Sequence, residues 1–296
     1  MNLETRKNSV YFNISMTAIM CAINVIFVLI TRFVPLSFMV FMFVLPSISV
    51  IQCLICKKVY FIPYLLVSAT LCFLVNIAEI SNTIFYIIPS LVIGFIIGFC
   101  FDHKVPVAYT FIIASIFQLI LSYITVPIVN AIYGINIIDL FVKAFGLSNF
   151  QYINEITPLF MYFMAAAQVA IALLISVLIQ KTLRIPIIFD LNQKYLVSIL
   201  AILLAILAPI FVLIPVLKNV SLLLFGIAIV LSIIELNKMT LENKIAIILL
   251  LCSFVISLFT FLLSAKYIIP PFQILVFEIM IFVSNFYIIY LDFRRK

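Results

Sequence analysis

The stretch YFNISMTAIMCAINVIFVLIT, residues 11–31, is long and apolar enough to cross a bilayer, which takes about 20 residues of helix. Ala18 and Ala22 are four residues apart and share one face of that helix, and small residues at this spacing let another helix approach closely. Thr17 and Asn24 occupy a different face, with Asn24 roughly 200° around the helix from Ala22 at about 100° per residue. The sequence therefore predicts one face for a neighbouring helix, either in a partner or in this chain, and one that offers hydrogen bonds inward.

The composition of the 296-residue chain is that of an integral membrane protein. Hydrophobic residues make up 67% and charged residues 9%, and the mean hydropathy is +1.41. A water-soluble domain of this size with so few charged residues could not cover its surface with polar groups. The net charge of +7 comes from cations that stand mostly singly or in pairs between apolar runs, with three in a row at residues 294–296. We interpret them as topology determinants and contacts to the anionic lipids of the bilayer. Nucleic-acid binding is not expected, because no basic stripe with interleaved aromatic residues is present.

Apolar segments follow one another along the whole chain and predict an all-α, polytopic membrane bundle of about ten transmembrane helices. The segments are 10–31, 33–56, 59–78, 80–101, 105–129, 157–180, 195–217, 219–234, 245–265 and 267–290. The eighth is short, so a hairpin or a buried half-helix is an alternative there. The loops are short except for Asn130–Ile156, which is a candidate lid over a site.

The distribution of Lys and Arg predicts the orientation of this bundle. With ten crossings and a cytoplasmic N-terminus, only four of the 17 cations fall outside: Arg32, Lys143, Lys218 and Lys266. Cytoplasmic loops carry the excess of Lys and Arg in membrane proteins. Both termini are therefore predicted to be cytoplasmic.

A polar stripe marks the fifth segment, where Ser115, Gln118, Ser122 and Thr125 fall within roughly an 80° arc at helical spacing. Polar groups in hydrocarbon need partners, so this stripe faces protein or a cavity. It predicts either hydrogen bonds between helices or one wall of a binding pocket.

Polar side chains also gather where the first six helices are predicted to reach the outside. Two carboxylates, one Arg and several amides there could surround a small polar solute. The alternative is that they are ordinary polar residues at the membrane surface. With Asn24, the candidate solute-binding residues are Arg32, Asn76, Glu79, Gln118, Thr125 and Glu155.

One carboxylate stands in the middle of the last apolar segment. Glu278 is about midway between Tyr267 and Tyr290, and Asn285 lies two turns away on the same face. A charged group at that depth costs several kcal/mol unless it is neutralised or paired. Glu278 therefore predicts a functional acid, with a protonated Glu bonded to a neighbouring helix as the alternative.

Motifs for catalysis or metal binding are not apparent. Cys53-x-x-Cys56 has neither a second cysteine pair nor a nearby His, and His103 is expected to be a solvated loop residue. Gly94-x-x-x-Gly98 predicts close helix packing. We expect no enzyme activity, no cofactor and no metal, and ATP hydrolysis would have to come from partners because the chain has no phosphate-binding loop.

Three features together resemble the S components of energy-coupling factor (ECF) transporters: Ala18-x-x-x-Ala22, a second span bounded by proline, and Gly94-x-x-x-Gly98. The resemblance covers residues 10–185. It implies a six-helix core, residues 1–185, that binds a micronutrient near the outer surface and docks through its first helix on a transmembrane T component driven by two ATPases. The runs TAIMCAINVIFVLITRFVPL and VLPSISVIQ are similar to the N-terminus of the YybS-like group of bacterial membrane proteins, whose longer chains match the four-helix extension 186–296. A multi-pass protein of the bacterial plasma membrane is implied.

Three functions follow as hypotheses. The first is an S-component-like membrane subunit that binds or transports a small solute and depends on partners for energy. The second is a stand-alone ion- or proton-coupled carrier with Glu278 as the coupling group. The third is a non-transporting membrane scaffold without a ligand.

Overall fold

The computed structural model describes residues 9–33, 37–77, 80–134, 136, 138–139, 143, 153–182, 196–236, 244–264, 268 and 270–294, and their regular structure is entirely helical. The longer helices are α2 (Val10–Phe33), α3 (Ser37–Ile55), α4 (Phe61–Val75), α6 (Ile88–Asp102), α7 (Val107–Tyr133), α9 (Ile153–Thr182), α10 (Leu196–Val212), α11 (Lys218–Leu236), α12 (Lys244–Ser264) and α14 (Glu278–Arg294). Short elements are η1 (Lys58–Tyr60), α5 (Ile80–Asn82), η3 (Thr83–Ile87), η4 (Pro215–Leu217), α13 (Pro270–Gln273) and η5 (Ile274–Phe277).

Apolar helices coincide with each of the ten predicted segments. Among the described residues, six helical stretches are long and apolar enough to cross a membrane: Val10–Thr31, Lys58–Val75, Val107–Tyr133, Thr157–Gln180, Pro215–Ile233 and Ile274–Leu291. Shorter apolar helices cover Phe43–Ile55, Ile88–Asp102, Val197–Val212 and Leu251–Ser264. The eighth segment forms the continuous 19-residue helix α11, so the hairpin and half-helix alternatives do not apply to it.

The predicted loop Asn130–Ile156 is wrong at both of its ends. Helix α7 continues to Tyr133, and α9 already begins at Ile153. Gly134 ends α7 in the left-handed conformation, with φ of 62°, and its N–H bonds to the carbonyl of Asn130. A glycine adopts this cap without strain, and it lies four residues beyond the predicted boundary.

The chain divides into two compact units. Unit 1 contains residues 1–137 and 164–190, and unit 2 contains residues 138–163 and 191–296. The sequence analysis expected a division at 185/186. The structure differs in grouping residues 138–163, which include the first part of α9, with the C-terminal helices.

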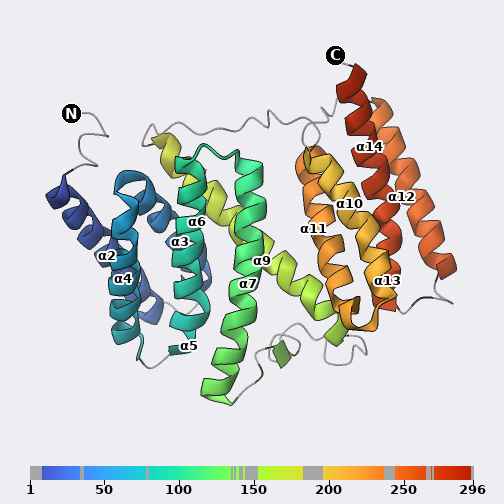
Figure 1. The fold of residues 1–296 in the computed structure, drawn as a ribbon. Coiled ribbons are helices and arrows are strands. Elements are labelled where there is room, and N and C mark those ends of the chain that lie inside the picture. The colour runs from blue at the N-terminus through green and yellow to red at the C-terminus, as the bar shows by residue number, and fades with distance from the viewer. Residues whose placement is uncertain are drawn as a thin grey trace. The chain divides into compact units, whose positions relative to one another are not determined.

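Unit 1 is built around the close contact of α3 with α6 (Figure 1). Gly94 and Gly98 of α6 face α3, where an added Cβ would meet the backbone at Pro46 and Val50. The predicted role of these glycines in packing is confirmed. Helix α2 packs on α3 and α4, and α7 packs on α6. The second part of α9 joins this core through Val169, Ala172 and Leu173.

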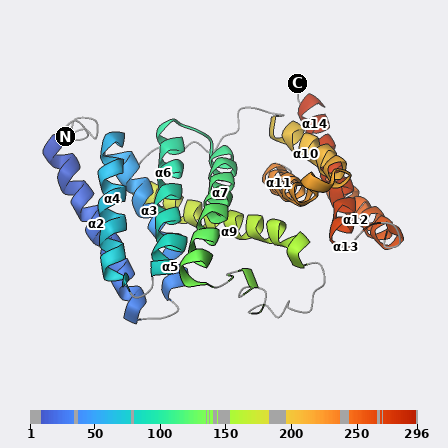
Figure 2. The same ribbon diagram turned by 60° about the horizontal axis from the view of Figure 1, so that its bottom comes forward.

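The C-terminal helices of unit 2 are α10, α11, α12 and α14, with α14 packed against the other three (Figure 2). Aromatic rings align α12 with the start of the last helix, because Phe277 lies 6.2 Å from Phe254 and 5.8 Å from Phe261 between ring centroids. Gly226 of α11 faces Leu159 and Tyr162.

Two of the predicted helices are interrupted, which the sequence analysis did not predict. In unit 1 the helix that begins at Ile80 passes through the π-helical turn η3 before α6. Pro89, near the start of α6, has no N–H for the regular hydrogen-bond ladder. In unit 2, α13 and the 3₁₀ turn η5 precede α14. Such interruptions often accompany functional sites or hinges.

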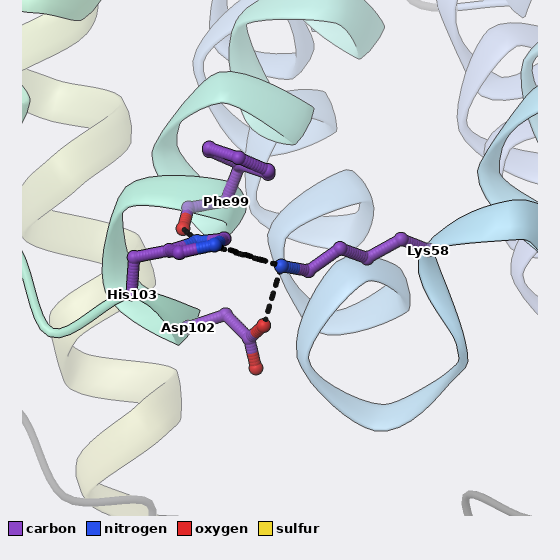
Figure 3. A network of polar contacts seen from close by, with 4 residues as sticks. All are labelled: Lys58, Phe99, Asp102 and His103. Atoms are coloured by element: carbon purple, nitrogen blue, oxygen red, sulfur yellow. Dashed lines mark hydrogen bonds and ion pairs between the residues drawn. The ribbon is translucent and has the colours of Figure 1, made fainter.

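A polar cluster ties η1, the turn just before α4, to the end of α6 (Figure 3). Lys58 Nζ lies 3.0 Å from Asp102 Oδ2 and 3.2 Å from His103 Nε2. His103 Nδ1 donates to the carbonyl of Phe99 at 2.8 Å, which leaves Nε2 as the acceptor for Lys58. His103 is exposed, as predicted. An exposed ion pair of this kind contributes about 0–1 kcal/mol.

Candidate functional site

The polar face of α2 is turned into unit 1. Asn13, Thr17 and Asn24 are exposed by 8% or less. Gln52 Nε2 donates to Thr17 Oγ1 at 2.8 Å, and the backbone N–H of Lys57 donates to Asn13 Oδ1 at 2.8 Å. These bonds join α2 to α3 and to the residues that follow it. Polar groups in an apolar core need such partners.

Tyr64 is the centre of a second polar group between α2, α3 and α4. Asn24 Nδ2 donates to Tyr64 Oη at 2.8 Å and to Ser68 Oγ at 3.1 Å. Ser49 Oγ lies 2.9 Å from Tyr64 Oη. Both amide hydrogens of Asn24 are thus used between helices, and Tyr64 is fully buried. This arrangement assigns Asn24 a part in holding α2 against α4.

Ala18 and Ala22 are on the opposite side of α2 and are exposed. The predicted geometry, with the alanines outward and Asn24 inward, is confirmed. Docking of a partner helix on the alanines stays a prediction. Large apolar side chains flank them, and Ile14, Ile19 and Ile26 are each at least half exposed. A surface of this composition suits lipid or another apolar helix.

The polar stripe of α7 meets an amide on α9. Gln118 Nε2 donates to Gln168 Oε1 at 2.7 Å. Gln118 is 4% exposed and Ser115 is 0% exposed. Neither Gln118 Oε1 nor Ser115 Oγ has a hydrogen-bond partner among the described residues. The two residues are three apart and share one face of α7. Two buried oxygens without a hydrogen-bond partner therefore lie on the same side of α7.

Gln118 does not lie at the outer end of its helix, where the sequence analysis placed it. It is eleven residues from the start of α7 and fifteen from its end. The predicted segment 105–129 already has Gln118 near its middle, so the expected outer position was an error of depth and does not come from the helix boundary. Gln168 is also near the middle of its helix, so the amide pair lies at mid-depth.

Asn24 and Thr125 make their described hydrogen bonds elsewhere and not to this amide pair. Thr125 Oγ1 donates to the carbonyl of Ser122, and Asn76 is buried at the end of α4. Asn24 belongs to the Tyr64 group. Glu79 and the side chains of Arg32 and Glu155 lie outside the described residues.

Gln168 was missed by the sequence analysis, although a signal for it exists. It is the one strongly polar side chain in MAAAQVAIALL, residues 164–174. An amide at such a depth predicts a partner on a neighbouring helix. Gln180, further along α9, is 1% exposed and has neither amide atom paired within the described part of the chain.

Metal ligation has no support in the described residues, where no group of three or more His, Cys, Asp or Glu side chains occurs. Cys53 and Cys56 are buried free thiols. Cys56 Sγ lies 3.6 Å from Gln52 Oε1, so it belongs to the polar contacts between α2 and α3.

In unit 2, the last helix carries two buried polar groups. Glu278 is 6% exposed and Asn285 is 0% exposed. Asn285 Nδ2 donates to Ser232 Oγ at 2.8 Å and to the carbonyl of Ile281. Glu278 Oε1 has no partner in the part of the chain that the structure describes. The predicted burial of Glu278 is confirmed.

Comparisons of the chain with protein-family models, with curated proteins and with solved structures found no match.

Proposed function

We propose that this protein is a multi-pass membrane subunit that binds a small polar solute at the contact of α7 and α9. The observation that carries this proposal is the open oxygen pair, Gln118 Oε1 and Ser115 Oγ, in a buried apolar surrounding. A buried polar atom without a partner costs about 1–3 kcal/mol. A solute with hydrogen-bond donors removes that cost when it binds.

The chemistry of the site defines the solute class. Gln118 offers a carbonyl oxygen, and Ser115 offers a hydroxyl that accepts or donates. Around them, Ala114, Leu119 and Ala172 are buried and apolar. The site therefore suits a small neutral or amphipathic molecule with amide or hydroxyl donors. A strongly ionised solute would find no opposite charge on these described residues.

The orientation in the membrane is part of this proposal. Ten crossings with both termini in the cytoplasm account for the asymmetry of the cations, of which only Arg32, Lys143, Lys218 and Lys266 fall outside. Lys57 and Lys143 are both exposed and belong to opposite sides in this arrangement.

The orientation is tested by the single-cysteine variants Lys57→Cys and Lys143→Cys on a background without the six native cysteines. A thiol reagent that does not cross membranes is added to intact cells. We expect it to label residue 143 directly and residue 57 only after the membrane is made permeable. Labelling of residue 143 only from the cytoplasmic side would contradict the ten crossings.

Energy for transport would come from partner proteins, because the chain has no phosphate-binding loop of the G-x-x-x-x-G-K-[ST] type. The exposed face with Ala18 and Ala22 supports docking of a transmembrane partner. This combination is the one expected for an S-component-like or YybS-like protein of the bacterial plasma membrane, with a T-type component and ATPases as partners.

The solute is tested by native mass spectrometry of the protein purified in mild detergent. We expect a bound small molecule in the wild type, and Gln118→Leu should weaken its affinity about tenfold and so lower its occupancy, since one lost buried hydrogen bond of about 1.4 kcal/mol raises the Kd tenfold. Gln273→Leu is the matched control, because Gln273 is a buried glutamine of unit 2 that bonds to the carbonyl of Ile268. A bound molecule retained equally by both variants contradicts the site. No bound molecule under any condition favours a scaffold.

A further inference from the structure

The strongest unexplained feature outside the α7–α9 site is the acid at the joint of the last helix. The 3₁₀ turn η5 ends at Phe277, and the α-helix α14 begins at Glu278. Glu278 is 6% exposed, and its Oε1 has no partner among the described side chains and backbone groups. A carboxylate in this position would be buried and uncompensated.

The elements packed on α14 bring no opposite charge to this depth. Helix α10 has no ionisable side chain. Helix α12 has Lys244 as its first residue and the exposed thiol of Cys252, and the ionisable groups of α11 are Lys218 and Glu235, near its two ends. Lys218 Nζ lies over the ring of Phe272, at 4.7 Å from the centroid. The remaining ionisable residues of unit 2 helices are Glu155 and Tyr162 of α9 and Tyr287, Tyr290, Asp292 and Arg294 of α14. The neutral, protonated form of Glu278 is thus favoured.

Ser257 supplies an open oxygen from the neighbouring helix. It is 0% exposed, and its Oγ has no partner within the described residues. Phe254 and Phe261, one turn away on either side of Ser257, both contact the ring of Phe277. Ser257 therefore lies on the face of α12 that is turned to Phe277 of η5. Its Oγ and Glu278 Oε1 are not hydrogen-bonded to each other in this structure.

Two further buried polar residues, Ser284 and Asn285, lie along α14 toward its C-terminal end. Asn285 is seven residues beyond Glu278, which places it on the same face two turns away. It bonds to Ser232, and Ser284 beside it is also buried. The 3₁₀ turn before Glu278 has a weaker hydrogen-bond geometry than an α-helix. This permits local movement of the acid.

We propose that Glu278 and Ser257 form a proton-exchange site in unit 2. In the protonated state the carboxyl O–H would donate to Ser257 Oγ after a change of the Glu278 side-chain rotamer, because Ser257 Oγ has no partner among the described residues. On release, the O–H bond of Glu278 breaks, the proton passes to water, and the carboxylate remains. Uptake reverses this step, and no redox partner is needed. The site is separate from the solute site of unit 1 and does not depend on it.

The test is infrared difference spectroscopy of the full chain in lipid bilayers during a pH titration. The carbonyl stretch of a protonated carboxylic acid reports the proton directly. We expect one such band at about pH 6, where aqueous carboxyls are already ionised, and its loss at higher pH. Glu278→Gln should remove the band, and Ser257→Ala should shift its frequency and midpoint. Asp102→Asn, which changes a partly exposed acid of unit 1 paired with Lys58, should leave it in place.

Two results would overturn the proposal. A band that persists unchanged over the whole pH range marks a permanently protonated, structural Glu278, and its absence at pH 6 in the wild type marks a carboxylate. Sodium at constant pH and ionic strength provides a further arm. Loss of the band with sodium but not with potassium would make this a sodium site and would contradict proton exchange. If Glu278→Gln does not fold, the wild-type titration and Ser257→Ala still test the proton-exchange proposal.

Discussion

Gly94→Ala is expected to destabilise the protein by about 3 kcal/mol or more, at the upper end of the cost of overpacking. A Cβ at Gly94 would overlap the carbonyl oxygen of Pro46 and approach the Cβ of Ser49. The obstacle is helix backbone, which cannot move without separating α3 from α6. Since those helices form the closest contact of unit 1, the whole unit should loosen.

Gly226→Ala is the matched control, because it is also a glycine-to-alanine change inside a helix. Its Cβ would meet the end of the Leu159 side chain at 2.8 Å and the ring of Tyr162 at 3.0 Å. Both obstacles are side chains, whereas the obstacle at Gly94 is helix backbone. The gain in helix propensity is about 1 kcal/mol at both positions, so it cancels in the comparison. Thermal unfolding can be followed with a thiol-reactive dye, since Cys21, Cys53, Cys56, Cys72 and Cys100 are buried. Equal melting temperatures of the two variants would contradict the observed α3–α6 contact.

The double variant Ala18→Leu/Ala22→Leu is expected to abolish copurification of a membrane partner while the protein stays folded. Both alanines are exposed on α2, so leucines there face lipid at little cost. They would nevertheless add bulk where a partner helix needs close approach. Expression and melting temperature should change little, and recovery of the partner should fall to background.

Ile19→Leu is the control for this experiment, because Ile19 is half exposed on the same helix and the change conserves volume. It should leave partner recovery intact. If the double variant instead loses its fold, at the cost of about 1–3 kcal/mol typical of overpacking, the alanines pack inside this protein. That result would remove the main support for an S-component-like role.

The helices could be predicted from the sequence because apolar length alone specifies them. The two faces of α2 could also be predicted, since Ala18, Ala22 and Asn24 differ by known rotations about one helix. The predicted helix ends were less accurate, since α7 ends at Gly134, four residues beyond the predicted boundary. The π turn at Thr83–Ile87 and the 3₁₀ turn before Glu278 depend on how neighbouring helices compete for backbone hydrogen bonds, so they could not be predicted.

The sequence also could not predict which residues on different helices contact each other. Gln118 was recognised as a polar residue in need of a partner, but Gln168 was not assigned to it, because periodicity gives a direction on one helix and not the neighbour that lies there. The same holds for Asn24, which bonds to Tyr64 and Ser68 some forty residues away. Asn285 and Ser232 form a third such pair.

The central claim is that the α7–α9 contact of unit 1 binds a polar solute. The most direct measurement is a cryo-electron microscopy structure of the full chain in lipid nanodiscs, prepared without added ligand and again with the small molecule identified by mass spectrometry. We predict density for the added molecule within hydrogen-bond distance of Gln118 Oε1 or Ser115 Oγ. A closed contact in which both oxygens bond only to the protein itself, with the molecule absent or bound elsewhere, would contradict the claim.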